Sequence, residues 1–375
     1  MRNTSVFVCL SLAAMTSSAA EPGLYKPHGQ KAFDFWYAKS GETYHAFYLQ
    51  RPDGAGQGSN TSVGAATSHD LAHWTEVGEV LRADPKAGWC NQRIATGSTW
   101  HGKDRWQMLF TAHGGSSGNV GLAESDDLRK WTMIGPARID YRNHVVPDDP
   151  YWQHCGLKPG ETIAYRIAAD PYVLPEPLDG WHYMVANCTV VGRPINQRGC
   201  IGLMRSHDGQ IWEDCGIISL MLDYDRPETP QLWQHGEGWY LYFGGAREEK
   251  QFCRHNRLYT ARSMRGPFEP PPRSEVKLPD GRGFYIAKVL TDPRGARHIV
   301  GRHRRRLHES TLSDHLRGRR LADAGDALDV GQRRRRGGHE AWGKASAKHP
   351  LTIAGCSTVS CLQRTLHARG PTRAA

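Results

Sequence analysis

The sequence predicts an all-β fold, a five-bladed β-propeller with an incomplete fifth blade that is followed by a disordered basic tail. Three observations predict it. Segments of alternating apolar and polar residues recur in pairs, a short phrase is repeated after most of these pairs, and no run of ten or more residues has the periodicity of an amphipathic helix. Repeated units of about four strands are typical of β-propellers.

Five hairpins with strands of period two are expected, and each of the first four is followed by a copy of the phrase. Three copies hold a Ser, any one residue, an Asp and, four positions after the Asp, a Trp. The Ser-x-Asp pair suits a tight turn whose side chains bind backbone amides, and the Trp caps the neighbouring core layer. The hairpins span residues 33–50, 96–112, 168–188, 226–245 and 284–301, and the phrases span residues 66–78, 123–135, 204–216 and 261–271, the last with Phe268 in the Trp role.

The chain divides into three segments. Residues 1–20 have an early Arg2, an apolar run and a small-residue end at Ala20, which is the layout of a secretory signal peptide and predicts a secreted or periplasmic location. Residues 21–301 hold the hairpins and form the expected propeller domain. Because no phrase follows the fifth hairpin, this domain is expected to lack the outer half of its last blade.

Residues 302–375 form an Arg-rich tail of a different character. They hold 14 Arg and 2 Lys against 6 acidic residues, which accounts for the whole net charge of +10, and they contain one of the chain's 35 aromatic residues. One hypothesis is that the reading frame shifts near residue 302, and the other is that the tail is a basic arm for nucleic acid or anionic surfaces. Because stacking aromatics are missing and export is expected, we expect no nucleic-acid partner and no membrane partner.

Two interpretations stay open for the cysteines that follow Cys9. They show no C-x-x-C spacing of the kind that binds metals. Cys188 and Cys200 face each other across one hairpin and form a disulfide, or they are isolated buried thiols.

Three acidic residues stand near the start of the first strand in different blades: Asp34, Asp170 and Glu228. In a propeller the first strand of every blade lines the central channel, so residues at one end of these strands converge on one pocket. Taken singly, Asp170 also suits a turn before Pro171, and Glu228 suits a solvated loop. Clustered carboxylates repel one another, which is costly unless chemistry uses them, so the joint placement predicts a catalytic site.

These residues resemble the five-bladed propeller glycoside hydrolases of the invertase and levanase type, glycoside hydrolase family 32, with the arabinanase and xylosidase relatives of family 43. The resemblance covers most of residues 24–301. It rests on Asp34 followed by the strand Tyr44-His45-Ala46-Phe47-Tyr48-Leu49-Gln50, on the phrase from Ser68 to Trp74, on Thr96-Gly97-Ser98 for the family's S-G-S, on Ala169-Asp170-Pro171 for its R-D-P, and on Glu228-Thr229-Pro230 for its E-C-P.

Two elements of the family pattern are altered. No Asn precedes Asp34, and the arginine that adjoins the second Asp is missing, although Arg166 stands four residues earlier. That arginine contacts the sugar in invertases, so the resemblance supports the reaction type better than the choice of sugar.

The resemblance implies a hydrolase of furanoside-type sugars that acts on an oligo- or polysaccharide. Glycoside hydrolysis needs one carboxylic acid to protonate the leaving oxygen and one carboxylate on the other side of the anomeric carbon. By resemblance, Glu228 is the general acid/base, with a pKa raised through desolvation by Trp233 and Trp239, and Asp34 is the nucleophile or the base that activates water. Asp170 stays ionised, binds sugar hydroxyls and stabilises positive charge in the transition state.

The expected sugar-binding wall combines aromatic faces with polar groups that read hydroxyls: Trp36, Gln50, Ser98, Arg166 and Tyr285. No metal and no cofactor is expected, and the protein is expected to be a monomer. The alternatives are an arabinofuranosidase or xylosidase of the same superfamily, or a sugar-binding propeller without catalytic activity.

Overall fold

The computed structural model describes residues 5–8, 24–55, 61–115, 119–246, 255–272, 274–276, 285–292 and 297–304. This part of the chain is all-β, as predicted, with one short helix, α1 (Pro150–His154), and one 3-10 turn, Ile195–Gln197. No helix within it is long and apolar enough to cross a membrane. The expected tail lies outside the described residues beyond Arg304, and so does the expected signal peptide apart from Ser5–Val8.

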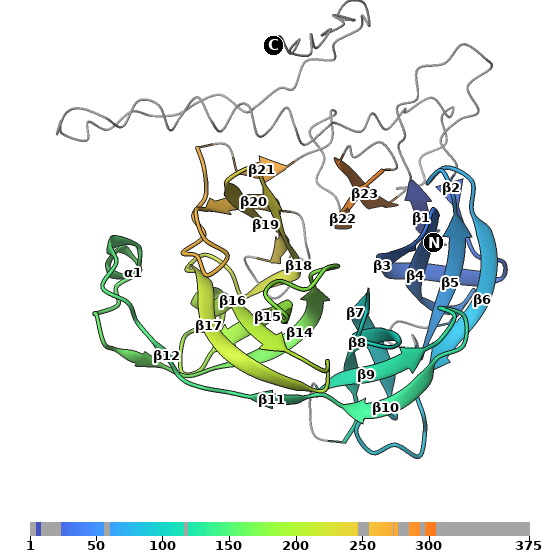
Figure 1. Ribbon diagram of the computed structural model, residues 1–375, viewed down its shortest axis with the longest axis horizontal. Coiled ribbons are helices and arrows are strands. Elements are labelled where there is room, and N and C mark those ends of the chain that lie inside the picture. The colour runs from blue at the N-terminus through green and yellow to red at the C-terminus, as the bar shows by residue number, and fades with distance from the viewer. Residues whose placement is uncertain are drawn as a thin grey trace, which may run out of the picture.

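Four sheets are each built from one continuous stretch of chain, and Figure 1 shows them around a common centre as propeller blades. Their strands pair antiparallel, and each sheet begins with its innermost strand. The first holds β3 (Gln30–Ser40), β4 (Thr43–Pro52), β5 (Ser62–Ser68) and β6 (Thr75–Arg82); the second holds β7 (Arg93–His101), β8 (Trp106–His113), β9 (Asn119–Ser125) and β10 (Thr132–Pro136).

The third and fourth blades follow the same plan with small additions. The third holds β14 (Tyr165–Val173), β15 (His182–Val190), β16 (Gly199–Ser206) and β17 (Ile211–Met221), and β11 (Arg138–Asp140) pairs in parallel with β17 at its edge. The fourth holds β18 (Arg226–His235), β19 (Gly238–Ala246), β20 (His255–Ala261) and β21 (Glu275–Val276). A separate two-stranded ribbon, β12 (His144–Val145) with β13 (Thr162–Ile163), flanks α1 along the chain.

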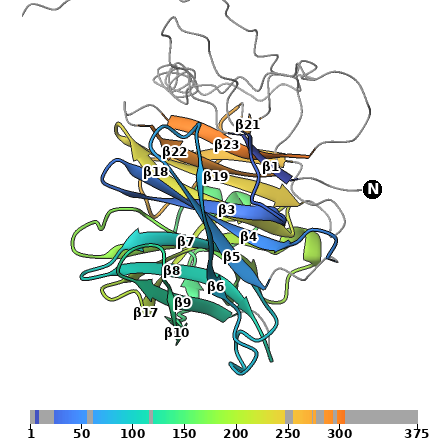
Figure 2. The same cartoon turned by 90° about the vertical axis from the view of Figure 1, so that its right-hand side faces the viewer.

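The fifth hairpin, β22 (Tyr285–Thr291) and β23 (Arg297–Arg304), has outer strands after all. β1 (Ser5–Val8) pairs with β23, and β2 (Leu24–Tyr25) pairs with β1, which completes a four-stranded sheet. The expectation that this sheet lacks its outer half is therefore wrong, because its missing strands come from the start of the chain. β22 contacts both β18 and β3, and Figure 2 shows this sheet edge-on beside them.

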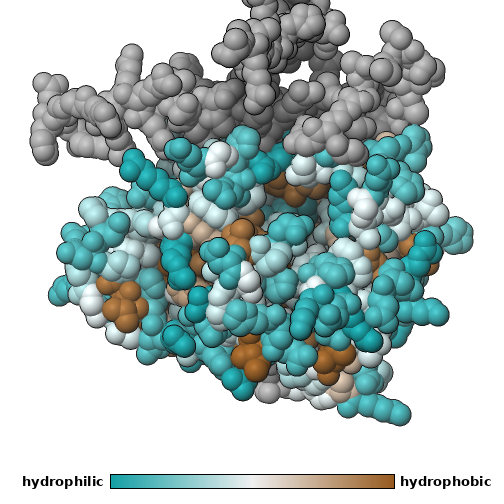
Figure 3. Space-filling view, viewed as in Figure 1, coloured by the Kyte–Doolittle hydropathy of each residue, from teal (hydrophilic) through white to brown (hydrophobic). Residues whose placement is uncertain are grey.

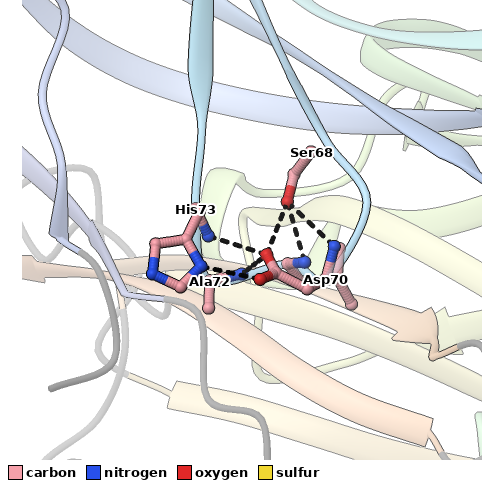
Figure 4. A network of polar contacts seen from close by, with 5 residues as sticks. Ser68, Asp70, Ala72 and His73 are labelled. Atoms are coloured by element: carbon pink, nitrogen blue, oxygen red, sulfur yellow. Dashed lines mark hydrogen bonds and ion pairs between the residues drawn. The ribbon is translucent and has the colours of Figure 1, made fainter. Parts of the chain in front are cut away.

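The repeated Ser-x-Asp phrase forms the predicted turn. In its first copy, the Ser68 hydroxyl accepts hydrogen bonds from the amides of Asp70 and Leu71 at 3.2 and 2.8 Å. The Asp70 carboxylate accepts bonds from the amides of Ala72 and His73 at 2.9 and 2.8 Å, as Figure 4 shows. The same four bonds recur in the copies that begin at Ser125 and Ser206.

The residue after the Asp has a left-handed backbone in all three copies: Leu71, Leu128 and Gly209 have φ of 65°, 62° and 76°. Only the third copy uses glycine, for which this conformation carries no steric cost. The four side-chain-to-amide bonds stabilise the turn in the other two copies, where a leucine must adopt it.

The hydrophobic core is divided into layers that lie between neighbouring sheets. The expected caps belong to these layers, since Trp212 and Phe268 are fully buried in two of them. Two further layers join β22 and β23 to the first blade through Leu290 and to the fourth through Ala287. On the face shown in Figure 3, hydrophilic residues cover most of the surface between separate apolar patches.

Cys188 and Cys200 lie directly opposite each other on β15 and β16, as the sequence suggested. Both are buried free thiols, and burial raises the pKa of the Cys200 thiol. The structure therefore agrees with the interpretation of buried thiols.

Candidate active site

A β-bulge interrupts the first strand of each of the four blades, β3, β7, β14 and β18, and another interrupts β22. The register shifts fall between Ala32 and Phe35, Ala95 and Gly97, Ala169 and Tyr172, Glu228 and Gln231, and Tyr285 and Ala287. A bulge bends its strand and changes the direction in which the side chains beside it point. Asp34 and Asp170 lie inside two of these bulges and Glu228 directly precedes a third, so all three predicted acids stand where the strands are irregular.

Asp170 fixes the start of β18 to β14. Its carboxylate accepts a hydrogen bond from the amide of Thr229 at 3.0 Å, and its own amide donates to the Thr111 hydroxyl at 2.9 Å. Both Asp170 and Thr229 have a left-handed backbone, with φ of 57° and 50°. This conformation is strained for a β-branched threonine, and such strain collects at functional sites.

Asp34 is half-buried and belongs to the same polar network. The Thr96 hydroxyl donates to the Asp34 carboxylate at 2.6 Å, and the Thr111 hydroxyl donates to the Thr96 carbonyl at 3.3 Å. Since Thr111 also accepts from the Asp170 amide, two threonines of the second blade connect the acids of the first and third blades.

A buried lysine, which the sequence reasoning missed, completes this cluster. Lys288 on β22 is 2% exposed, and its charge interacts with those of Asp170 and Asp34. Burial lowers its pKa to about 8, while the two carboxylates oppose that shift. The only sequence signal is a single lysine within the otherwise apolar strand YIAKVLT.

The same environment raises the pKa of Asp170 to about 6. Burial is the main cause, the bond from Thr229 opposes it, the charge of Asp34 raises the pKa further, and that of Lys288 lowers it. Near pH 7 the lysine is therefore protonated and Asp170 is mostly ionised.

Glu228 stands one residue before Thr229 and is half-buried. The bond between Thr229 and Asp170 places the backbone beside Glu228 against the acidic cluster. Trp233 and Trp239 were expected to desolvate Glu228. Both line a cavity farther along the inner strands, and Glu228 is not among the residues that line it.

That cavity has a volume of about 830 Å³ and is lined by residues that follow the bulges. Trp36 donates its ring N–H to the Thr99 hydroxyl at 3.0 Å, and the Val173 amide donates to the Ser98 hydroxyl at 3.0 Å, so this level also connects successive blades. Trp36 and Ser98 line the cavity, whereas Asp34, Asp170 and Glu228 do not. Along the inner strands of the propeller, the acids thus come first, and these two predicted wall residues follow them at the cavity.

The other predicted wall residues are dispersed. Gln50 is buried and donates to the Ser62 hydroxyl at 3.3 Å. Arg166 is exposed, with its guanidinium 4.7 Å from the centre of the Tyr141 ring. Tyr285 begins β22, but its side chain lies outside the described part of the structure. Across the described residues, no group of three His, Cys, Asp or Glu side chains is arranged to hold a metal ion.

No protein-family model matches the sequence, and no curated protein matches it. Solved structures do match. A GH32 beta-fructofuranosidase from Bombyx mori aligns with a TM-score of 0.53 at 16% identity, covering 76% of this chain and 58% of that one. A sucrose-6-phosphate hydrolase from Lactobacillus gasseri aligns with a TM-score of 0.53 at 19% identity, covering 69% and 51%.

An alpha-L-arabinofuranosidase of GH43 from Clostridium thermocellum aligns with a TM-score of 0.51 at 14% identity, covering 72% of this chain and 82% of that one. The chain shares the fold of GH32 and GH43 glycoside hydrolases. The resemblance predicted from the sequence is thereby confirmed at the level of the fold. The chain spans about half of the length of the Bombyx mori and Lactobacillus proteins.

Proposed function

We propose that the chain is a glycoside hydrolase that cleaves furanoside-type sugars with paired carboxylates. One observation carries this proposal: acids from two blades share a buried charge cluster with Lys288, and the residue after Glu228 is hydrogen-bonded to one of them. Two carboxylates that share one charge cluster repel each other, and such arrangements collect where chemistry needs them. The fold shared with GH32 and GH43 enzymes supports the same conclusion by analogy.

The roles follow from the chemistry of glycoside hydrolysis. Glu228 acts as general acid/base towards the leaving oxygen, and Asp34 acts on the other side of the anomeric carbon as nucleophile or base. Asp170 stays ionised and stabilises the oxocarbenium-like transition state. Its pKa of about 6 leaves it mostly ionised at neutral pH, and Lys288 favours that charged form.

The remaining parts of the proposal concern the chain as a whole. The sheet of β22, β23, β1 and β2 is the fifth blade, which is supported by the contacts of β22 with both β18 and β3. The substrate is an oligo- or polysaccharide and the protein acts as an exported monomer. β1 lies within the expected signal peptide, so cleavage after Ala20 would remove it from the fifth blade. N-terminal sequencing of the exported protein decides between the two: a start at Ser5 or earlier contradicts cleavage after Ala20, and a start near Glu21 contradicts β1 as a strand of this blade.

The decisive experiment replaces Glu228 by Gln and measures the release of reducing sugar from a panel of fructosides, arabinofuranosides and xylosides. Loss of general acid/base catalysis lowers the rate by about 10²–10⁴-fold. The control is Glu237→Gln, an exposed glutamate in the turn between β18 and β19, which should leave the rate unchanged. Full activity of the Glu228→Gln variant would refute the assignment.

A sugar-binding propeller without catalytic activity is the second candidate. It is favoured by one observation, that the 830 Å³ cavity is not lined by the three acids. Saturable sugar binding with no turnover of any substrate in the panel would support it and exclude the hydrolase.

A further inference from the structure

The 830 Å³ cavity has its own chemistry, separate from that of the three acids. It is lined by the later parts of the inner strands and by the loops that follow them. Along β3, β14 and β18, each acid precedes the lining residues by at least two positions. The cavity therefore lies beyond the acids along the inner strands. Lys288, which belongs to the charge cluster with Asp34 and Asp170, also lines the cavity.

Aromatic rings make up much of the wall: Trp36, Tyr44, Trp100, Trp106, Trp233 and Trp239. The faces of such rings pack against the C–H groups of a sugar ring and bury large apolar areas. Trp233 is held in place from behind, because its ring stacks on that of Tyr240 with a centroid distance of 5.8 Å and an interplanar angle of 10°.

The charges that line the cavity are mostly positive. Lys39, Lys103 and Arg297 stand against one acid, Glu176, while Asp170 and Asp34 already offset the charge of Lys288. Arg297 is fixed in position: it donates to the Gln234 carbonyl at 2.8 Å, and its guanidinium lies 6.0 Å from the centre of the Trp233 ring. A fixed guanidinium beside an aromatic face suits a ligand that presents a carboxylate next to a ring.

Two buried polar atoms of the wall are without hydrogen-bond partners in the described structure. They are the ring nitrogens Trp100 Nε1 and His182 Nδ1. Trp100 is 1% exposed and His182 is 7% exposed. The two rings lie 6.1 Å apart between centroids. An unsatisfied buried polar atom lowers stability, so a ligand oxygen that reached either nitrogen would stabilise this region. Burial lowers the pKa of His182, which keeps the imidazole neutral.

We propose that this cavity is a second carbohydrate-binding site, which takes an acidic saccharide of the uronate class. The sugar ring packs on the aromatic wall, and its carboxylate pairs with Arg297, with Lys39 and Lys103 adding positive charge. This site does not depend on the chain being a hydrolase, since none of the three acids lines it.

The test is a titration of the full-length chain with digalacturonate and with its methyl ester, followed by calorimetry and tryptophan fluorescence. The ester keeps the shape of the ligand and removes its charge. We expect saturable binding of the acid, and binding of the ester that is weaker by about tenfold or more, equivalent to about 1.4 kcal/mol. Arg297→Gln should weaken binding of the acid by a similar factor, and Arg297→Lys should weaken it less because the charge remains.

Two matched variants locate the ligand. Arg205→Gln removes another arginine that lies over a tryptophan, at 4.0 Å from the centre of the Trp181 ring and away from the cavity, and it should bind digalacturonate normally. Glu228→Gln should also bind it normally, whatever happens to turnover. The proposal is overturned if digalacturonate shows no saturable binding, if acid and ester bind equally, or if Glu228→Gln abolishes binding while a folded Arg297→Gln variant retains it.

Discussion

The charge cluster predicts that replacing Lys288 by Met destabilises the protein in a pH-dependent way. Methionine fills a similar volume, so the change mainly removes the buried positive charge that lies near Asp170 and Asp34. Removing one partner of a buried ion pair costs about 3–5 kcal/mol, because the remaining charge is left without compensation. A loss of this order is expected near neutral pH.

The pH dependence follows from Asp170. Its pKa in the folded protein, about 6, lies above its ordinary value of 3.8. The stability that the protonated carboxyl contributes is therefore complete below about pH 4 and is lost as the pH rises through 6. Without Lys288 the pKa of Asp170 in the folded protein rises by about 1–3 units. The variant therefore continues to lose stability above pH 6, at about 1.4 kcal/mol per pH unit, whereas the stability of the parent no longer changes with the titration of Asp170.

The assay is chemical or thermal unfolding of parent and variant at pH 5 and pH 7. The variant should lose about 1.4 kcal/mol more at pH 7 than at pH 5, which corresponds to roughly 3–5 °C in the unfolding midpoint. Lys39→Met serves as the control, since this exposed lysine lines the cavity but lies outside the cluster. An equal loss for Lys288→Met at both pH values would show that the lysine acts through packing, and would refute the electrostatic account.

Three further outcomes are expected. Asp208→Ala removes two bonds to backbone amides in a repeated turn and should lower the free energy of unfolding by about 1–2 kcal/mol; no change in a urea titration would contradict the role given to the turn. Gly97→Ala would place a Cβ 2.4 Å from the Leu109 carbonyl oxygen and should destabilise the protein strongly, whereas Gly88→Ala, with nothing within 4 Å, should not. Hydrolysis, once a substrate is found, should decline as the pH falls through about 6 because Asp170 becomes protonated; a rate that is constant down to pH 4 would contradict its role.

The sequence predicted the features that depend on local patterns, namely the strands and the repeated turns. Alternating strands and the Ser-x-Asp turns depend on neighbouring residues, and the three turn copies form the same four bonds. The three acids were predicted to converge because a repeat places equivalent residues at one end of the inner strands. The repeat therefore allowed the sequence alone to predict which residues lie near one another in the folded protein.

The features that the sequence did not predict depend on contacts between distant segments. The pairing of β1 with β23 joins the two ends of the described chain, and no local pattern in Ser5–Val8 specifies it. Bulges are likewise invisible, because an extra residue in one strand is defined only against its partner. Lys288 was missed for a similar reason: a lysine in an apolar strand acquires charged partners only when acids of other blades are close to it.

Several unfavourable features of backbone conformation and charge burial occur together around the acids at the centre of the propeller. A threonine and an aspartate adopt left-handed backbones, two carboxylates share one charge cluster, and a buried lysine belongs to the same cluster. Each departure lowers stability on its own, and an apolar core of the kind that fills the layers between the blades would avoid all of them. Natural sequences keep such conflicts where function requires them. The cavity beyond the acids is lined by one member of that cluster, Lys288, and combines aromatic rings with positive charge. This difference in chemistry supports the two separate proposals, proton transfer at the acids and binding of an acidic sugar in the cavity.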